Sequence, residues 1–104
     1  MGIEFESIMK KTFKLTHEKL NVDRHIDATR HEIRKYIKRE RRRALPEGAD
    51  YWDFDCRFGT DEANCEEIHL SEIDKMINWA IEDERLSFYL EILAKPAKRK
   101  RDAE

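Results

Sequence analysis

The sequence predicts a two-layer α+β sandwich, in which a four-stranded antiparallel sheet carries two helices on one face. Three observations lead to this fold class. Strand-like segments alternate apolar and polar residues, two longer segments repeat apolar residues with a period near 3.6, and the segments follow one another as β-α-β-β-α-β. That order is the split βαβ pattern of ferredoxin-like domains, and right-handed crossovers would place both helices on one side of the sheet.

Four segments carry the alternation expected of strands. Residues 12–16, 51–58 and 87–94 are rich in β-branched and aromatic residues, and residues 66–70 form a shorter return strand after the turn at Gly59. If residues 66–70 are only a loop, the sheet has three strands. The side chains predicted to face the helices are Phe13, Leu15, Trp52, Phe54, Cys56, Phe58, Ile68, Leu70, Phe88, Leu90 and Ile92.

Two segments have the apolar spacing of amphipathic helices. The first begins after Asn21, a predicted N-cap, and ends near Pro46 and Gly48. Its core-facing stripe consists of Val22, Ile26, Thr29, Ile33, Ile37, Glu40 and Ala44. The second helix has Ser71 as its predicted N-cap and Asp74 three residues later. Its apolar stripe consists of Ile73, Met76, Ile77, Ala80 and Ile81.

The chain length of 104 residues suits one domain with one hydrophobic core. We expect residues 9–96 to form this domain, residues 1–8 to be a flexible extension and residues 97–104 to be a flexible charged tail. The sequence has no recognisable export signal and no run of about 18 apolar residues. It therefore predicts a cytoplasmic location and no membrane partner.

The strand register predicts that the two cysteines do not form a disulfide, because Cys56 falls on the inner face of the sheet and Cys65 on the outer face. Two thiols are also too few for a zinc site made of thiolates. No histidine spacing, glycine-rich loop or nucleophile motif indicates a metal, a cofactor or a catalytic residue. We therefore expect no cofactor, and we favour a binding role over an enzymatic one.

Charge is strongly segregated along the chain, although the net charge is only −2. Residues 1–46 carry a net charge of +6, residues 47–84 carry −11 and residues 85–104 carry +3. Seven of the ten residues from 34 to 43 are basic, at the C-terminal end of the first helix. Cations at that end complement the negative pole of the helix dipole.

The basic helix end is the first candidate binding surface. Clustered Arg and Lys side chains neutralise phosphates and release counterions, so the cluster predicts a site for RNA or a ribonucleoprotein. The alternative is a solvated helix end that the acidic half of the molecule partly neutralises, and the pI near 6.1 favours this alternative. The assigned residues are Arg34, Lys35, Lys38, Arg39, Arg41, Arg42 and Arg43, joined by the basic tail at residues 98–101.

The outer face of the sheet is the second candidate surface. Tyr51 and Tyr89 are candidate stacking platforms for bases, but the neighbouring carboxylates would repel phosphates. The second hypothesis is therefore a protein-interaction module or a small-ligand or metal-binding module, with a homodimer as one form of it. A small enzyme is the third hypothesis. The assigned residues are Tyr51, Asp53, Asp55, His69, Tyr89 and Glu91.

Four stretches of the sequence resemble a family of small, uncharacterised bacterial proteins. These stretches are MKKTF at residues 9–13, RALPEG at 43–48, YWDFDCRFG at 51–59 and SFYLEILAKP at 87–96. They lie within residues 9–96, which is most of the chain. The resemblance implies a bacterial origin and a cytoplasmic location. It transfers no activity and no site residue, because the family has no assigned function.

Overall fold

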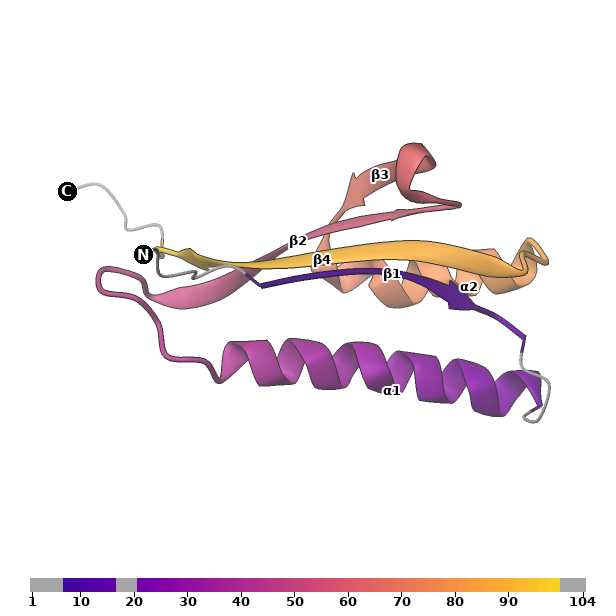
Figure 1. Ribbon diagram of the computed structural model, residues 1–104, viewed down its shortest axis with the longest axis horizontal. Helices are drawn as coiled ribbons and strands as arrows, with labels where there is room; N and C mark the ends of the chain where they lie inside the picture. The colour runs from indigo at the N-terminus through magenta and orange to yellow at the C-terminus, as the bar shows by residue number, and fades with distance from the viewer. Residues whose placement is uncertain (1–6, 17–20, 100–104) are drawn as a thin grey trace.

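The computed structural model describes residues 7–16 and 21–99, and its elements follow the predicted β-α-β-β-α-β order (Figure 1). A sheet and two helices form two layers, so the predicted α+β class is confirmed. The elements are β1 (Ser7–Lys14), α1 (Val22–Arg41), β2 (Tyr51–Gly59), β3 (Cys65–Ile68), α2 (Ile73–Glu82) and β4 (Ser87–Ala97), with short 3-10 helices η1 (Glu62–Asn64) and η2 (Leu70–Glu72) on either side of β3.

The strands lie in the order β1-β4-β2-β3, and each neighbouring pair is antiparallel. A ferredoxin-like sheet has its first and third strands at the centre, whereas here those two strands are the edges. The ferredoxin-like topology is therefore not established. The order of elements along the chain could not decide this, because it does not specify which strands become the central pair.

The composition of the strands explains which of them are central. The inward side chains of β4 at Phe88, Leu90 and Ile92 are essentially fully buried. The edge strand β1 contains three lysines, and the edge strand β3 has only four residues, of which Glu66 and Glu67 are exposed. Short or charged strands suit the edge of a sheet because they discourage pairing with other chains.

Both helices cover the same face of the sheet. Arg41, at the end of α1, lies over the ring of Phe54, and Trp79 of α2 meets Phe58 edge-on with ring centroids 6.4 Å apart. Phe54 and Phe58 share the inner face of β2 because they are four residues apart. The inward residues of β1, β2 and β4, together with Leu15 directly after β1, are buried in one cluster, as predicted: Phe13, Leu15, Trp52, Phe54, Cys56, Phe58, Phe88, Leu90 and Ile92.

The helix ends agree with the sequence in part. Asn21 caps α1 as predicted, because its side chain accepts a hydrogen bond from the backbone N–H of Arg24 at 2.8 Å. The prediction that Ser71 caps the second helix is wrong. The chain forms η2 first, and the ring of His69 accepts the backbone N–H of Ser71 while the Glu72 carboxylate accepts the backbone N–H of His69. α2 begins only after this turn.

The ordered sheet extends beyond the predicted domain boundaries at both ends. Ser7 pairs with Ala94 and Ile8 with Leu93, so these two residues belong to β1 rather than to an extension. Ala97 belongs to β4 and pairs with Tyr51. The rest of the expected extension, residues 1–6, and the end of the expected tail, residues 100–104, lie outside the described residues.

The two cysteines lie on opposite faces of the sheet, as the register predicted. Cys56 pairs with Ile68 and points into the core, whereas Cys65 pairs with Gly59 and is only half-buried. Both thiols are free. Burial, and then the negative charges of Asp55 and Asp53, raise the pKa of the Cys56 thiol to about 12.

Replacing Leu90 with Ala should lower the free energy of unfolding by about 2–5 kcal/mol, because Leu90 is 0 % exposed and its loss leaves a cavity. Leu86→Ala is the matched control, since Leu86 is 75 % exposed, and it should change stability by less than about 0.5 kcal/mol. Urea denaturation followed by tryptophan fluorescence measures both. Equal effects in the two variants would contradict the assigned core.

Only Cys65 should react when the folded protein meets a thiol reagent at about pH 8, because Cys56 is inaccessible and its raised pKa keeps it protonated. Mass spectrometry should find one label on the folded chain and two after denaturation. A Cys65→Ser control should take no label while folded. Two labels on the folded wild-type chain would refute the register of β2.

Candidate nucleic-acid interface

The helical period divides the basic run of α1 into two groups. Lys35, Lys38 and Arg42 are exposed on the side of the helix that faces away from the core. The other arginines of the run contact aromatic rings or carboxylates of the same molecule; they are Arg34, Arg39, Arg41 and Arg43. The predicted cluster is therefore continuous in the sequence but divided in the structure. One group of its side chains faces the solvent, and the other contacts rings or carboxylates of the same molecule.

Arg43 is held by three contacts that fix the end of α1 to the sheet. Its guanidinium lies over the ring of Trp52, 4.8 Å from the centroid, and its Nη1 donates to Glu40 Oε1 at 2.8 Å. The indole Nε1 of Trp52 donates to the carbonyl oxygen of Arg43 at 2.9 Å. These contacts order the residues that leave α1, because they involve both the side chain and the backbone of Arg43.

Glu40 is the one acidic residue of the run, and it faces inward. It is 4 % exposed, and its carboxylate lies 2.8 Å from Arg43 Nη1 and 3.5 Å from Arg39 Nε. A buried carboxylate requires such partners, because burial of an unpaired charge is costly. The consequence for the surface is that the exposed side of the run between residues 34 and 43 is entirely cationic.

Two further arginines cover aromatic rings. The guanidinium of Arg41 lies 5.5 Å from the ring centroid of Phe54, and that of Arg39 lies 5.4 Å from the ring centroid of Tyr36. Both rings are themselves buried. The arginines thus use the faces of these rings within the molecule, and the rings present no open surface on which a base could stack.

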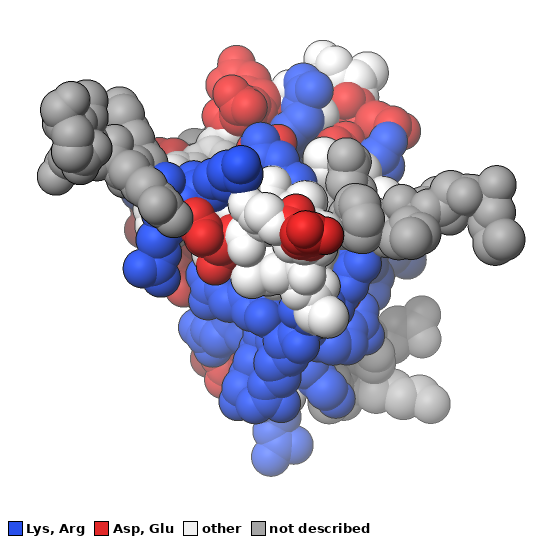
Figure 2. Space-filling model, turned by 90° about the vertical axis from the view of Figure 1, so that its left-hand side faces the viewer, with Lys and Arg blue, Asp and Glu red and all other residues white. Residues whose placement is uncertain are grey.

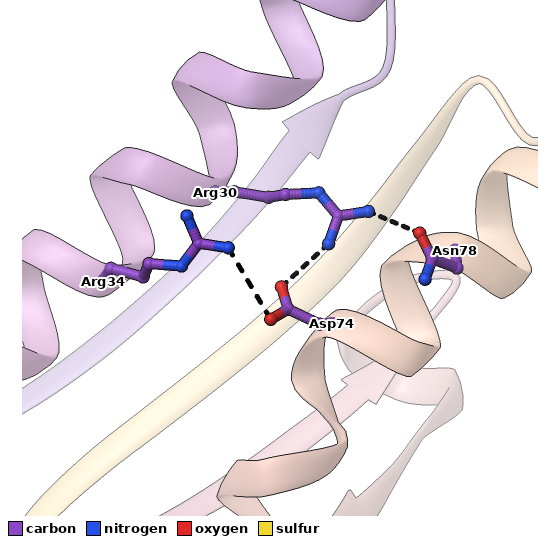
Figure 3. A network of polar contacts seen from close by, with 4 residues as sticks. All are labelled: Arg30, Arg34, Asp74 and Asn78. Atoms are coloured by element: carbon purple, nitrogen blue, oxygen red, sulfur yellow. Dashed lines mark hydrogen bonds and ion pairs between the residues drawn. The ribbon is translucent and has the colours of Figure 1, made fainter.

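One arginine of the run contacts the acidic half of the chain. Arg34 Nη2 lies 3.7 Å from Asp74 Oδ2, and the neighbouring Arg30 donates to Asp74 and Asn78 at 2.8 and 2.5 Å (Figure 3). These contacts join α1 to α2. Among residues 7–16 and 21–99, no other ion pair links the basic run to residues 47–84. In this part of the chain, ion pairing between the basic run and the acidic half therefore involves Arg34 alone.

Part of the basic tail lies at the same end of the molecule. The backbone N–H of Asp50 donates to the Ala97 carbonyl at 2.8 Å, and the backbone N–H of Arg99 donates to the Asp50 carboxylate at 2.8 Å. These bonds hold the end of β4 beside the loop that follows α1, with Lys98 and Arg99 exposed. Figure 2 shows a broad patch of Lys and Arg side chains in the lower half of this end of the molecule, with acidic and uncharged side chains above it. Lys100 and Arg101 lie outside the described residues.

The outer face of the sheet is less open than predicted, and the assignment of Tyr89 as a stacking platform is wrong. Tyr89 is 5 % exposed, and its hydroxyl donates to Glu91 at 2.8 Å. Burial, that hydrogen bond and the charge of Glu91 together raise the pKa of the Tyr89 hydroxyl. Tyr89 pairs with Gly59, at the start of the turn into η1 and β3 that rises above the outer face (Figure 1).

Gly59 allows the backbone at Asn64 to pass close to the end of β2. A Cβ atom at residue 59 would lie 2.0 Å from the Asn64 carbonyl oxygen. Lys10 of β1 reaches Glu62 of η1 at 3.7 Å, which shows that η1 lies over the outer face of the sheet. The connection between β2 and β3 therefore covers Tyr89. A glycine at the end of a predicted strand was the only sequence signal of this arrangement.

The other residues assigned to the outer face have mostly local partners. Lys95 Nζ lies 2.8 Å from Asp55 Oδ2, and Asp53 Oδ1 accepts the backbone N–H of Phe54 at 2.8 Å. His69 caps η2, and Tyr51 is 38 % exposed. In the part of the chain that the structure describes, no three His, Cys, Asp or Glu side chains are grouped to hold a metal ion.

Nor does any described helix have the length and apolar character needed to cross a membrane.

Comparison with known proteins places the chain in one family. A family model described as a family of unknown function, DUF6172, matches residues 9–103, so the chain belongs to that family. This confirms the resemblance found in the sequence. Neither the curated proteins nor the solved structures include a significant match.

Replacing Glu40 with Ala should lower the free energy of unfolding by about 1.5–3 kcal/mol, because it removes the charged hydrogen-bond partner of Arg43. The control is Glu47→Ala, since Glu47 is exposed, and it should shift stability by less than about 0.5 kcal/mol. Urea denaturation again supplies the measurement. If Glu40→Ala is as stable as the control, the Glu40 carboxylate does not hold the helix end.

Proposed function

We propose that this member of the DUF6172 family is a non-enzymatic module that binds RNA, alone or within a ribonucleoprotein, through the basic end of α1. The observation that supports this most directly is the inward position of Glu40, which leaves the exposed side of the run with positive charge only. Lys35, Lys38 and Arg42 are exposed there, and Lys98 and Arg99 add cations at the same end of the molecule.

The chemistry of these side chains suits phosphate groups. Lysine offers a mobile point charge, and arginine offers a planar fork that can bind two phosphate oxygens. Each phosphate that a cation neutralises releases counterions into solution, which makes binding stronger at low salt. The overall pI near 6.1 does not prevent this. Among the described residues, only Asp74 of the acidic segment 47–84 forms an ion pair with the run, and Asp50, at the same end of the molecule, accepts the backbone N–H of Arg99.

The alternative function, an interaction or small-ligand module on the outer sheet face, has less support. Of its two tyrosines, Tyr89 is buried, and the carboxylate of Asp55 is paired with Lys95. A homodimer and a cytoplasmic location stay predictions from the sequence.

The triple variant Lys35→Ala, Lys38→Ala and Arg42→Ala should bind RNA more weakly than the wild type. The affinity of wild-type protein for mixed-sequence RNA should fall steeply as salt rises, and the triple variant should reduce the slope of log affinity against log salt by about 3, one for each lost phosphate contact. Fluorescence anisotropy of labelled RNA measures both slopes. These three side chains are exposed, so the fold should be retained, which circular dichroism checks.

A matched control removes three exposed cations elsewhere, with Lys10→Ala, Lys14→Ala and Lys75→Ala. It changes the net charge by the same amount, and its salt slope should stay close to that of the wild type. No RNA binding by the wild type at low salt would refute the proposed function. Equal losses in the two triple variants would show that overall charge, rather than this surface, attracts RNA.

A further inference from the structure

Tyr51 presents an exposed aromatic ring at the end of the molecule where α1 also ends. Its neighbours Trp52 and Phe54 are buried on the inner face of β2, so alternation places the Tyr51 side chain on the outer face of the sheet. The side chain is exposed, in contrast to that of Tyr89. Figure 1 shows the start of β2 beside the end of β4 at this end of the molecule.

The sheet is narrow at Tyr51, which leaves the ring uncovered. Tyr51 pairs with Ala97 of β4, whose side chain is a single methyl group. The pairing of β4 with β1 ends at Ala94, and β3 pairs with β2 only over residues 56–59. Two of the described strands alone therefore form the sheet at this level. No cation and no second ring from residues 7–16 and 21–99 packs against Tyr51.

A cleft with two exposed cations adjoins this ring. The cleft has a volume of about 700 Å³ and lies between the loop before β2 and the residues after β4. Its lining includes Asp50, Lys98 and Arg99. The Asp50 carboxylate accepts the backbone N–H of Arg99, while the side chains of Lys98 and Arg99 are exposed. Because Asp50 directly precedes Tyr51, the cations of the cleft lie next to the ring along the chain.

Tyr51 and the basic end of α1 lie on opposite faces of the sheet. On the inner face, the indole Nε1 of Trp52 donates to the Arg43 carbonyl oxygen at 2.9 Å, which holds the end of α1 against β2. Lys98 and Arg99 continue from the end of β4, so they lie at the end of the sheet where the two faces meet. A nucleic acid that contacts all these groups must bend around this end.

A single strand meets both requirements of this surface. It is flexible enough to bend around the end of the sheet, and its unpaired bases are free to stack on an aromatic ring. The bases of a duplex are stacked on one another, which leaves none for an isolated ring. Proteins that bind single strands commonly combine such a ring with nearby cations for the phosphates.

Two carboxylates follow Tyr51 along the outer face, and one lysine of β4 faces both of them. Lys95 is the strand partner of Asp53, and its Nζ lies 2.8 Å from Asp55 Oδ2. Opposite charges across neighbouring strands attract each other. The ammonium of Lys95 therefore reduces the repulsion between these carboxylates and a phosphate bound near Tyr51.

We propose that Tyr51 stacks an unpaired base of single-stranded RNA, and that the phosphates beside this base contact Lys98 and Arg99 on the way to the basic end of α1. This inference rests on the proposed function and adds the form of the RNA and the ring that holds a base. Every base has a π-face, so stacking on Tyr51 requires no particular sequence.

Fluorescence anisotropy tests the stacked base with two labelled RNA strands of about 12 nucleotides, one with bases and one abasic strand that keeps only the sugar-phosphate backbone. The wild type should bind the strand with bases about tenfold more tightly than the abasic strand. Tyr51→Leu should lose this preference, because leucine has no flat π-face, and should bind the abasic strand as the wild type does. Tyr51→Phe is the matched control, since it keeps the ring, and should retain the preference.

The double variant Lys98→Ala and Arg99→Ala tests the phosphate contacts. It should reduce the slope of log affinity against log salt by about 1.4 on both strands, because each phosphate contact contributes about 0.7 on a single strand. The variant keeps the backbone N–H of residue 99 that donates to Asp50. Lys10→Ala with Lys14→Ala removes two exposed cations elsewhere and should leave the slope unchanged. Equal slopes for the wild type and the Lys98→Ala, Arg99→Ala variant would overturn the inference.

Equal affinity of the wild type for the two strands would also overturn it, and so would a Tyr51→Leu variant that keeps the wild-type preference. Tighter binding to a duplex than to a single strand of the same sequence would exclude the single strand as the favoured ligand. In each of these outcomes RNA binding through the basic end of α1 can persist, whereas absence of all RNA binding at low salt would refute the proposed function itself.

Discussion

β4 pairs along both of its edges, with β1 on one side and β2 on the other, and its inward side chains determine where the helices can lie. Phe88, Leu90 and Ile92 are essentially fully buried, which requires that both helices cover this face. Phe88 stacks on Phe13 of β1 and on Phe58 of β2, with ring centroids 5.3 and 5.1 Å apart. The aromatic stack joins three strands at one level of the sheet and sets the surface that α2 meets through Trp79.

The positions of the helices on this core then decide which charges are available at the surface. The phase of α1 is fixed by its buried side, so that Glu40 points inward to Arg39 and Arg43 while Lys35, Lys38 and Arg42 point outward. The acidic Asp74 of α2 meets Arg30 and Arg34 at the line where the two helices approach each other. The fold thus separates charges that are neighbours in the sequence, and it leaves Lys35, Lys38 and Arg42 facing the solvent.

Much of the core was predictable, and the reason lies in the strands. The alternation of residues 51–58 and 87–94 identified the buried side chains of β2 and β4, and the opposite faces of Cys56 and Cys65 followed from the same pattern. The order of strands was not predictable from alternation, because pairing depends on contacts between segments far apart in the chain. The cap at His69 was missed because Ser and Thr are the usual N-caps and an imidazole that accepts a backbone N–H is less common.

The sequence predicted the basic surface of α1 better than it predicted the outer face of the sheet. The basic run was visible in the sequence, but only the helical period separates its outward members from those that lie against rings. Tyr89 was misplaced because alternation assigns it to the outer face of the sheet without showing that η1 lies above that face.

The arginines that lie over Tyr36, Phe54 and Trp52 give the positions in the basic run different chemical requirements. A guanidinium is flat and weakly hydrated, so it can rest on a ring and still bind a carboxylate, whereas the compact ammonium of lysine keeps its hydration shell and fits such a place poorly. Among family members, residues 39, 41 and 43 should therefore be restricted to arginine, while residues 35, 38 and 42 can exchange lysine and arginine freely. The family's pattern of exchange would then distinguish cations that hold the fold from cations that only supply charge.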